Sequence, residues 1–308
     1  MFHAPLNLTG RLPPALVGMA WMVGCTVAAV STHVIVRRTA GHLDPFQIVF
    51  LYQFFSLPAL LPMLLRNPAL LRTRRHGLLV LRGAAHLTSM TMFYFGLPLV
   101  PLAVAGALGF LAPLFAVALG AIVLREGFSA RRLLALVFGI AGMLVIVRPD
   151  PGAINEGALW LIGAAAIWGA VLVLLKVLGR TESSGTLTAW MALTMAPMAL
   201  IPAIPVWQEP ALADIAWLAL AGTLGIVSHF CLSQALRTGA INVVMPVDFL
   251  RLLWSALFGF AFFAEVPDLW TVVGGTMIFS ATTWLALRER AAARAVAAAA
   301  KAETDAPP

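Results

Sequence analysis

The chain has 308 residues, of which 61% are hydrophobic and only 11% are charged, and its mean hydropathy is +0.94. This balance excludes a soluble globular domain and indicates an integral membrane protein. The formal charge is +7, but the basic residues lie in short segments between apolar runs, which argues against nucleic acid as a partner.

Ten apolar runs of about 20 residues follow one another along the chain. Each is long enough to cross a hydrocarbon core of roughly 30 Å as a helix. Their hydrophobicity is continuous rather than alternating, which predicts helices and not a barrel. After Leu287 an alanine-rich tail predicts a fraying helix that becomes disordered. The expected spans are 14–37, 44–65, 77–97, 101–124, 130–148, 157–178, 186–206, 212–236, 240–264 and 268–287.

The basic residues between the spans predict the orientation of the chain. With the N-terminus in the cytoplasm, only Arg37, Arg38 and Arg148 lie on the far side, while Arg82 and Arg251 lie within spans. Basic residues concentrate in cytoplasmic segments, so the other fifteen favour cytoplasmic N- and C-termini in the plasma (inner) membrane of a bacterium. These are Arg11, Arg66, Arg72, Arg74, Arg75, Arg125, Arg131, Arg132, Lys176, Arg180, Arg237, Arg288, Arg290, Arg294 and Lys301.

A shift of 139 positions aligns the chain with itself without gaps, which indicates a tandem duplication. Each copy holds five spans, an odd number, so the second copy crosses the membrane in the opposite sense. The predicted fold class is therefore an all-α integral membrane protein of ten transmembrane helices in two inverted five-helix repeats. The repeats are expected at 14–148 and 152–287, with a cytoplasmic tail at 288–308. The matched pairs include Trp21/Trp160, Gly24/Gly163, Pro58/Pro197, Gly83/Gly222, Ser89/Ser228, Gly120/Gly259 and Glu126/Glu265.

Segments 94–149 and 234–284 share a pattern: an apolar helix, a Glu at its end, a short turn and a Gly-containing closing helix. Its markers are Pro113, Glu126 and Gly142 in the first copy and Glu265, Gly274 and Gly275 in the second. This pattern resembles the EamA-type repeat of the drug/metabolite transporter superfamily. The resemblance implies a ten-helix transporter in which four helices of each half surround a central cavity and the fifth and tenth are peripheral. It also implies a small organic solute, such as an amino acid, a nucleotide-like metabolite or a vitamin.

Charged groups inside a span cost about 2.5–3.5 kcal/mol on insertion scales, so each needs an explanation. Asp248 and Arg251 stand three apart on the ninth span, on one face and about 4.5 Å apart along the axis. One interpretation is that Arg251 holds a carboxylate or phosphate of a solute while Asp248 orients it or binds an amine or proton. The other is a mutually neutralised pair that fixes the helix.

Arg82 and His86 stand four apart on the third span, and Ser89 and Phe93 continue the same stripe. Arg82 is a candidate solute ligand, but it is close enough to the cytoplasmic end to snorkel to lipid phosphate. His86 titrates near neutral pH when unperturbed and is a candidate proton relay. The alternative for His86 is a neutral histidine that is hydrogen-bonded within the helix bundle.

Aromatic residues and matched prolines complete the candidate list. Trp168 and Trp254 are candidates for stacking on a planar solute, although packing against lipid is the commoner use of tryptophan in spans. Pro58 and Pro197 occupy matched positions and are expected to kink their helices as hinges, unless they are ordinary tolerated prolines. Polar groups expected to bond helix to helix are His33, Gln53, His229 and Gln234, and groups expected to cap or anchor loops are Glu126 and Glu265.

These features favour a transporter that moves a small polar or zwitterionic metabolite across the bilayer by alternating access, with proton coupling or exchange as options. The sequence has no Walker loop, and no catalytic or metal-binding constellation is expected, so neither a cofactor nor enzyme activity is predicted. Two alternatives are a lipid or lipid-carrier flippase of the same fold and, less favoured, an intramembrane enzyme. A flippase should have a lateral opening and a more apolar cavity.

Overall fold

The computed structural model describes residues 14–123, 130–148, 155–238, 247–248 and 250–304, and every regular element among them is helical. Six segments are long and apolar enough to cross a membrane, namely 16–39, 45–66, 102–120, 156–178, 185–203 and 212–232. The other expected spans stay predictions. The α-helices are α1 (Pro14–Thr39), α2 (Pro45–Arg66), α3 (His76–Gly96), α4 (Leu102–Gly109), α5 (Ala112–Val123), α6 (Ala130–Val147), α7 (Glu156–Leu178), α8 (Ser184–Ala203), α9 (Leu212–Thr238), α11 (Leu250–Phe263) and α12 (Leu269–Thr304).

Polar residues just before three of these helices explain where the helices begin. The first backbone N–H groups of a helix have no partner inside it, and a preceding side-chain oxygen satisfies one of them. Asp44 accepts from the Phe46 N–H at 2.8 Å at the start of α2. Asn155 and Ser183 play the same part for α7 and α8, accepting from backbone N–H groups three residues on at 3.1 Å.

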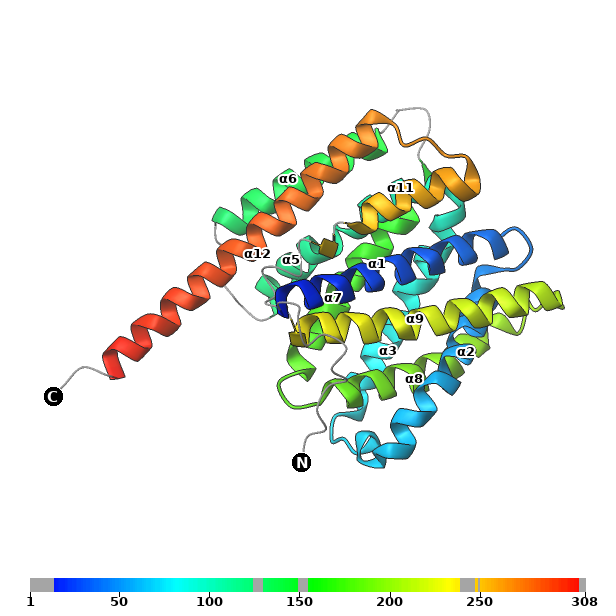
Figure 1. Cartoon of the computed structure of the whole chain (residues 1–308), viewed down its shortest axis with the longest axis horizontal. Helices are drawn as coiled ribbons and strands as arrows, with labels where there is room; N and C mark the ends of the chain where they lie inside the picture. Colours follow the sequence, from blue (N-terminus) through cyan, green and yellow to red (C-terminus); the bar gives the residue numbers. More distant parts are fainter. Residues whose placement is uncertain (1–13, 124–129, 149–154, 239–246, 249, 305–308) are drawn as a thin grey trace.

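The expected span 101–124 is not one helix, because the chain breaks between α4 and α5. Pro113 follows the break, and a proline has no N–H to donate to the preceding turn. The backbone tightens there instead: the Phe110 and Leu111 N–H groups donate three residues back at 3.1 and 3.0 Å. The last helix, α12, continues past the expected span to Thr304, as the helical tail expected after Leu287 implies, and extends well beyond the other helices (Figure 1).

The helices pair across the two halves of the chain. Helix α1 packs along α9, α3 along α7, and α2 along α8, while α6 and α12 lie side by side at one edge of the bundle (Figure 1). The α6–α12 crossing depends on small residues, since a Cβ added at Gly142 would lie 2.8 Å from the Gly274 carbonyl oxygen. Small residues let membrane helices approach closely.

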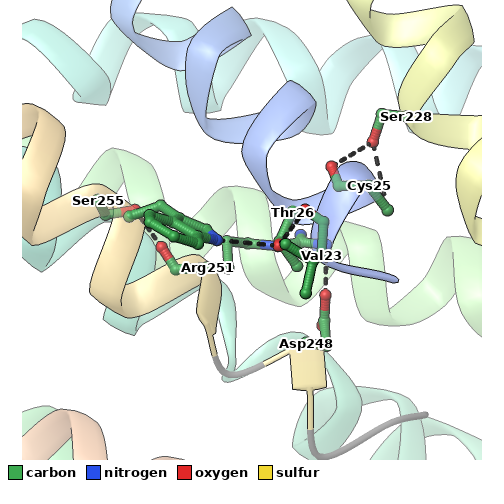
Figure 2. Close-up of polar contacts among 8 residues, drawn as sticks. Val23, Cys25, Thr26, Ser228, Asp248, Arg251 and Ser255 are labelled. Carbon is green, nitrogen blue, oxygen red and sulfur yellow. Dashed lines mark hydrogen bonds and ion pairs between the residues drawn. The ribbon is translucent and has the colours of Figure 1, made fainter. Parts of the chain in front are cut away.

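Residues at matched positions of the two halves make the same contacts. The Ser89 hydroxyl of α3 donates to the Ala164 carbonyl of α7 at 2.8 Å. Ser228 of α9 donates to the Cys25 carbonyl of α1 at 3.0 Å (Figure 2). Ser228 lies 139 positions after Ser89, and Ala164 lies 139 positions after Cys25. In each half, therefore, the first helix packs against the third helix of the other half.

Matched glycines also make equivalent contacts in the two halves. A Cβ at Gly24 would meet Cys231, and a Cβ at Gly163 would meet Met92, which is the position matched to Cys231. The α3–α8 and α9–α2 crossings are related in the same way, through contacts of Gly83 with Thr194 and of Gly222 with Phe55. The duplication in the sequence is thus a duplication of helix interfaces.

Candidate functional site

Asp248 and Arg251 form an ion pair at the start of α11. The Arg251 guanidinium donates to Asp248 Oδ1 at 2.8 Å, and the two side chains are 33% and 26% exposed (Figure 2). Ser255, one turn further on, donates its hydroxyl to the Arg251 carbonyl at 2.8 Å. The Arg251 Nε is buried without a hydrogen-bond partner. The pair is therefore neutral overall but keeps an unused donor.

Trp254 lies one turn along α11 and joins that helix to α1. Its indole N–H donates to the Thr26 hydroxyl at 3.1 Å, and Thr26 donates in turn to the Val23 carbonyl at 2.9 Å (Figure 2). The ring is only half-buried, and stacking on a solute stays a prediction. The role of Thr26 was not predicted, because a threonine in a span usually bonds to its own helix and its sequence shows no other signal.

Arg82 is directed into the protein toward α8 rather than toward lipid. Its side chain is 6% exposed, and one terminal nitrogen donates to the Leu187 carbonyl of α8 at 2.7 Å. The other lies 3.7 Å from the Met191 sulfur. The Arg82 Nε has no partner, and among the described residues no carboxylate forms an ion pair with this guanidinium.

His86 contacts Trp168 across the α3–α7 interface. The centres of the two rings are 4.5 Å apart, and the His86 Nδ1 is buried without a hydrogen-bond partner. His33 of α1 likewise has a buried Nδ1 without a hydrogen-bond partner, and its ring centre lies 4.9 Å from that of Phe93. Both histidines therefore keep a nitrogen unused within the helix bundle.

His229 of α9, which was expected to bond helix to helix, is exposed in the structure. The structure brings Arg82, His86 and Trp168 together in one group and Asp248, Arg251 and Trp254 in another. Within the part of the chain that the structure describes, no group of three His, Cys, Asp or Glu side chains could hold a metal ion.

Pro58 and Pro197 lie inside α2 and α8, and each helix continues through its proline. Each is followed by a second proline, Pro62 in α2 and Pro202 in α8. A proline in a helix interior removes one backbone hydrogen bond and crowds the preceding turn. The hinge role of both positions stays a prediction.

A second charged group lies where α1 ends and α4 begins. Arg37 pairs with Glu265 at 2.5 Å, and its guanidinium lies 4.6 Å from the ring centre of Phe263. The other Glu265 oxygen accepts from the Leu102 N–H at 2.8 Å, so this carboxylate anchors three helices, in line with the role expected for it. Glu126, its sequence match, lies outside the described residues.

Arg38 and Arg148, the other two arginines expected on the non-cytoplasmic side, also have partners. The Arg38 guanidinium lies 5.6 Å from the ring centre of Trp217. Arg148 forms an ion pair with Asp268 and lies 5.6 Å from the ring centre of Trp270. Contacts with acids and aromatic rings thus explain where Arg37, Arg38 and Arg148 lie.

A partly open apolar hollow of about 290 Å³ lies among α2, α3, α7 and α8, and none of the described residues that line it is charged. Its wall includes Phe46, Phe95 and Trp160. Trp160 stacks on Phe95 with ring centres 5.3 Å apart, and Phe95 contacts Phe46 at 5.2 Å. Packed aromatic side chains therefore form one part of the wall, and aliphatic residues and threonines form the rest.

Several known proteins are similar to this chain over most of its length. The S-adenosylmethionine uptake transporter of Rickettsia prowazekii is 28% identical, over 92% of this chain and 97% of its own. The riboflavin transporter of Brucella anthropi is 28% identical over 81% and 91%, and that of Vibrio cholerae is 27% identical over 82% and 87%. A crystal structure with 20% identity matches 89% of this chain and 97% of its own with a TM-score of 0.57, which shows a shared fold.

These relatives and the apolar helices identify an integral membrane transporter of small metabolites rather than an enzyme. The model of the EamA-like transporter family matches twice, at residues 16–148 and 155–287. The two matches together cover most of the chain and follow its internal duplication. This chain belongs to the EamA-like transporter family.

Proposed function

We propose that this protein is a secondary transporter that moves a small polar or zwitterionic organic metabolite by alternating access. The solute binds between the two halves, where the polar groups of the Asp248–Arg251 ion pair contact it. Arg82 and His86 contact the solute from α3, and the Trp168 ring of α7 stacks on a planar part of the solute. Coupling to protons or to a counter-solute supplies the driving force.

One observation carries this proposal: Arg82 and Arg251, one from each half of the chain, both have a buried Nε without a hydrogen-bond partner. Buried polar groups without partners are rare in proteins and cluster where a ligand binds. A solute seated there would contact both halves and would sense any change in their relative position.

The matched interfaces support alternating access. We take the two halves as inverted repeats with both termini in the cytoplasm, as the loop charges favour. Equivalent contacts, such as those of Ser89 and Ser228, then lie at opposite depths of the membrane. Two halves with the same interfaces can exchange conformations at little cost in free energy, so the site opens to one side and then to the other. Pro58 and Pro197 are the proposed hinges.

Flux through purified protein tests the proposal. The full chain is reconstituted in proteoliposomes, and uptake and efflux of labelled solutes are measured with and without a pH gradient. S-adenosylmethionine and riboflavin are the first solutes because similar proteins are named for them. Flux of at least one small metabolite above protein-free liposomes is expected, and no flux across a broad metabolite panel contradicts the proposal.

A lipid or lipid-carrier flippase is the second candidate, and the apolar hollow among α2, α3, α7 and α8 favours it. An acyl chain would fit a partly open hollow walled in part by aromatic rings, whereas the charged groups would have no obvious use. The same proteoliposomes distinguish the two functions. Fluorescent lipids are placed in both leaflets, and a reductant that cannot cross the membrane bleaches those in the outer leaflet. If the fluorescence of the inner-leaflet lipids is lost faster than in protein-free liposomes, the flippase is favoured.

A further inference from the structure

The charges around the proposed solute site do not balance. Arg251 has Asp248 as its partner at 2.8 Å. Arg82 has none among the described residues, although its side chain is 6% exposed and its Nε is unused. The atoms that Arg82 contacts, the Leu187 carbonyl oxygen and the Met191 sulfur, carry no formal charge. Charged side chains inside membrane spans are rare and mark solute pathways.

Arg82 is also held in a defined place. Its bond to the Leu187 carbonyl fixes one end of the guanidinium against α8, which leaves the Nε edge without a partner. One turn along α3, His86 leaves its Nδ1 unused and contacts the Trp168 ring. A fixed cation beside a neutral nitrogen and an aromatic face is suited to an anionic group attached to a planar or apolar body.

We infer that the transported solute carries a carboxylate or phosphate, which binds at Arg82 and supplies the missing negative charge. This inference rests on the proposed transport function and narrows its solute class. A solute that lacks an anionic group would leave the Arg82 guanidinium unpaired and would bind more weakly. Hydrogen bonds to charged groups are among the strongest in proteins, so the difference should be tenfold or more, about one to two orders of magnitude.

A mixed-solute flux experiment tests the solute class. Proteoliposomes with the full chain are given an equimolar mixture of matched pairs: amino acids with their decarboxylated amines, nucleotides with their nucleosides, and flavin mononucleotide with riboflavin. Mass spectrometry then measures what crosses. Members with a carboxylate or phosphate should cross about tenfold faster or more than their partners. Equal transport within the pairs overturns this inference but leaves transport intact, whereas no transport of any member contradicts the proposed function as well.

Variants of Arg82 test whether this side chain causes the preference for solutes with a carboxylate or phosphate. Arg82→Gln should remove the preference for the anionic members, and Arg82→Lys, which keeps the charge, should retain part of it. Arg66→Gln, at the exposed end of α2, is the matched control and should change nothing. Gel filtration checks that each variant folds. A folded Arg82→Gln protein with an unchanged preference overturns the assignment to Arg82.

A separate observation concerns the contact of Arg37 with Glu265, which we call the Arg37 latch. Its two side chains are only 15% and 17% exposed. The chain is shaped to place the carboxylate: Ala264 adopts φ 54°, and the Glu265 N–H reaches back to the Gly259 carbonyl at 3.1 Å. A residue other than glycine rarely adopts this left-handed conformation, so it persists only where its surroundings require it. A Cβ at position 259 would crowd the carboxylate at 3.0 Å.

The internal repeat retains the charges of the Arg37 latch. The offset of 139 carries Arg37 onto Lys176, near the end of α7, and Glu265 onto Glu126, which lies outside the described residues. Gly259 matches Gly120 in the same way. Only 11% of the residues are charged, so two matches that keep the sign of the charge are hard to obtain by accident. This retention links the latch to the exchange between the two halves.

We also propose that the Arg37 latch is a gate: it holds its face of the transporter closed and breaks when that face opens. Breaking it separates α1 from α11 and frees the Glu265 carboxylate, which accepts from the Leu102 N–H at the start of α4, to move. In an alternating-access cycle the opposite face, where α7 ends, then closes. A purely structural anchor would show no effect at that distant face.

Hydrogen–deuterium exchange of the full chain in lipid nanodiscs tests the gate without any solute. In Glu265→Gln, exchange should rise on the order of tenfold at the start of α4 and should fall at the last turn of α7. Arg37→Lys keeps the ion pair but loses the planar contact with Phe263, so smaller shifts of the same signs are expected. A rise confined to the α4 face, or no change at either face, overturns the gate.

Discussion

The two halves of the chain agree at their interfaces and differ at their charges. Matched glycines and serines, such as Gly83/Gly222 and Ser89/Ser228, make equivalent contacts between equivalent helices. Arg82 is matched instead by Ala221. Asp248 and Arg251 are matched by Gly109 and Ala112, where the chain breaks between α4 and α5. The shared positions build the scaffold, and the unshared ones are where the solute chemistry is proposed to reside.

Substituting a shared glycine should have the largest effect on the protein. A Cβ at Gly222 would lie 2.9 Å from the Tyr52 carbonyl oxygen of α2, which cannot move without shifting that helix. Gly222→Leu should therefore prevent stable assembly, and a membrane extract should yield little monodisperse protein on gel filtration. Gly77→Leu is the control, since nothing lies within 4 Å of a Cβ there. Normal yield of the Gly222 variant would contradict the close-packed interface.

Removing the Trp168 ring should weaken transport without loss of fold. Aromatic contacts contribute about 0.5–1.5 kcal/mol beyond the area they bury, so Trp168→Ala should raise the KM for solute by roughly two- to twelvefold. Trp168→Phe should recover most of the loss. Flux measured over a range of solute concentrations separates KM from the maximal rate. A reduced maximal rate with an unchanged KM would argue that Trp168 only supports α7.

The prolines allow a test of the exchange between halves. If Pro58 and Pro197 are matched hinges, Pro58→Ala and Pro197→Ala should each slow the maximal flux by a similar factor while leaving KM nearly unchanged. Their loss restores a helical hydrogen bond and stiffens the helix. The double variant should be slower than either single one. Full flux in both single variants would make the prolines ordinary residues of the scaffold.

The smallest expected effect is the loss of the matched serine bonds. Hydrogen bonds between membrane helices contribute about 0.6 kcal/mol on average. Ser89→Ala and Ser228→Ala should therefore lower thermal stability only slightly and by similar amounts. Thr88→Ala, whose hydroxyl bonds within its own helix, serves as the control. A loss confined to one of the two serine variants would show that the interfaces are not equivalent in energy.

Most of the helices could be predicted, because runs of about 20 apolar residues have few other structures available in a membrane. The break after Phe110 could not be placed, since prolines such as Pro113 are also tolerated within membrane helices. The pairing of Trp254 with Thr26 depends on how α1 and α11 meet, and the sequence holds no signal for it. The Arg37–Glu265 pair did leave a signal: the internal repeat retains charges at both positions.

The Arg251→Ala variant decides whether the solute binds at a position that the two halves do not share. This change installs at position 251 the residue found at its match, Ala112. Flux in proteoliposomes and the melting temperature are measured on the same preparation. Flux should fall at least about 100-fold, while insertion and melting temperature should stay close to wild type. A variant that fails to insert, or one that transports normally, would contradict a solute-binding role, because Arg251 would then serve only its ion pair with Asp248.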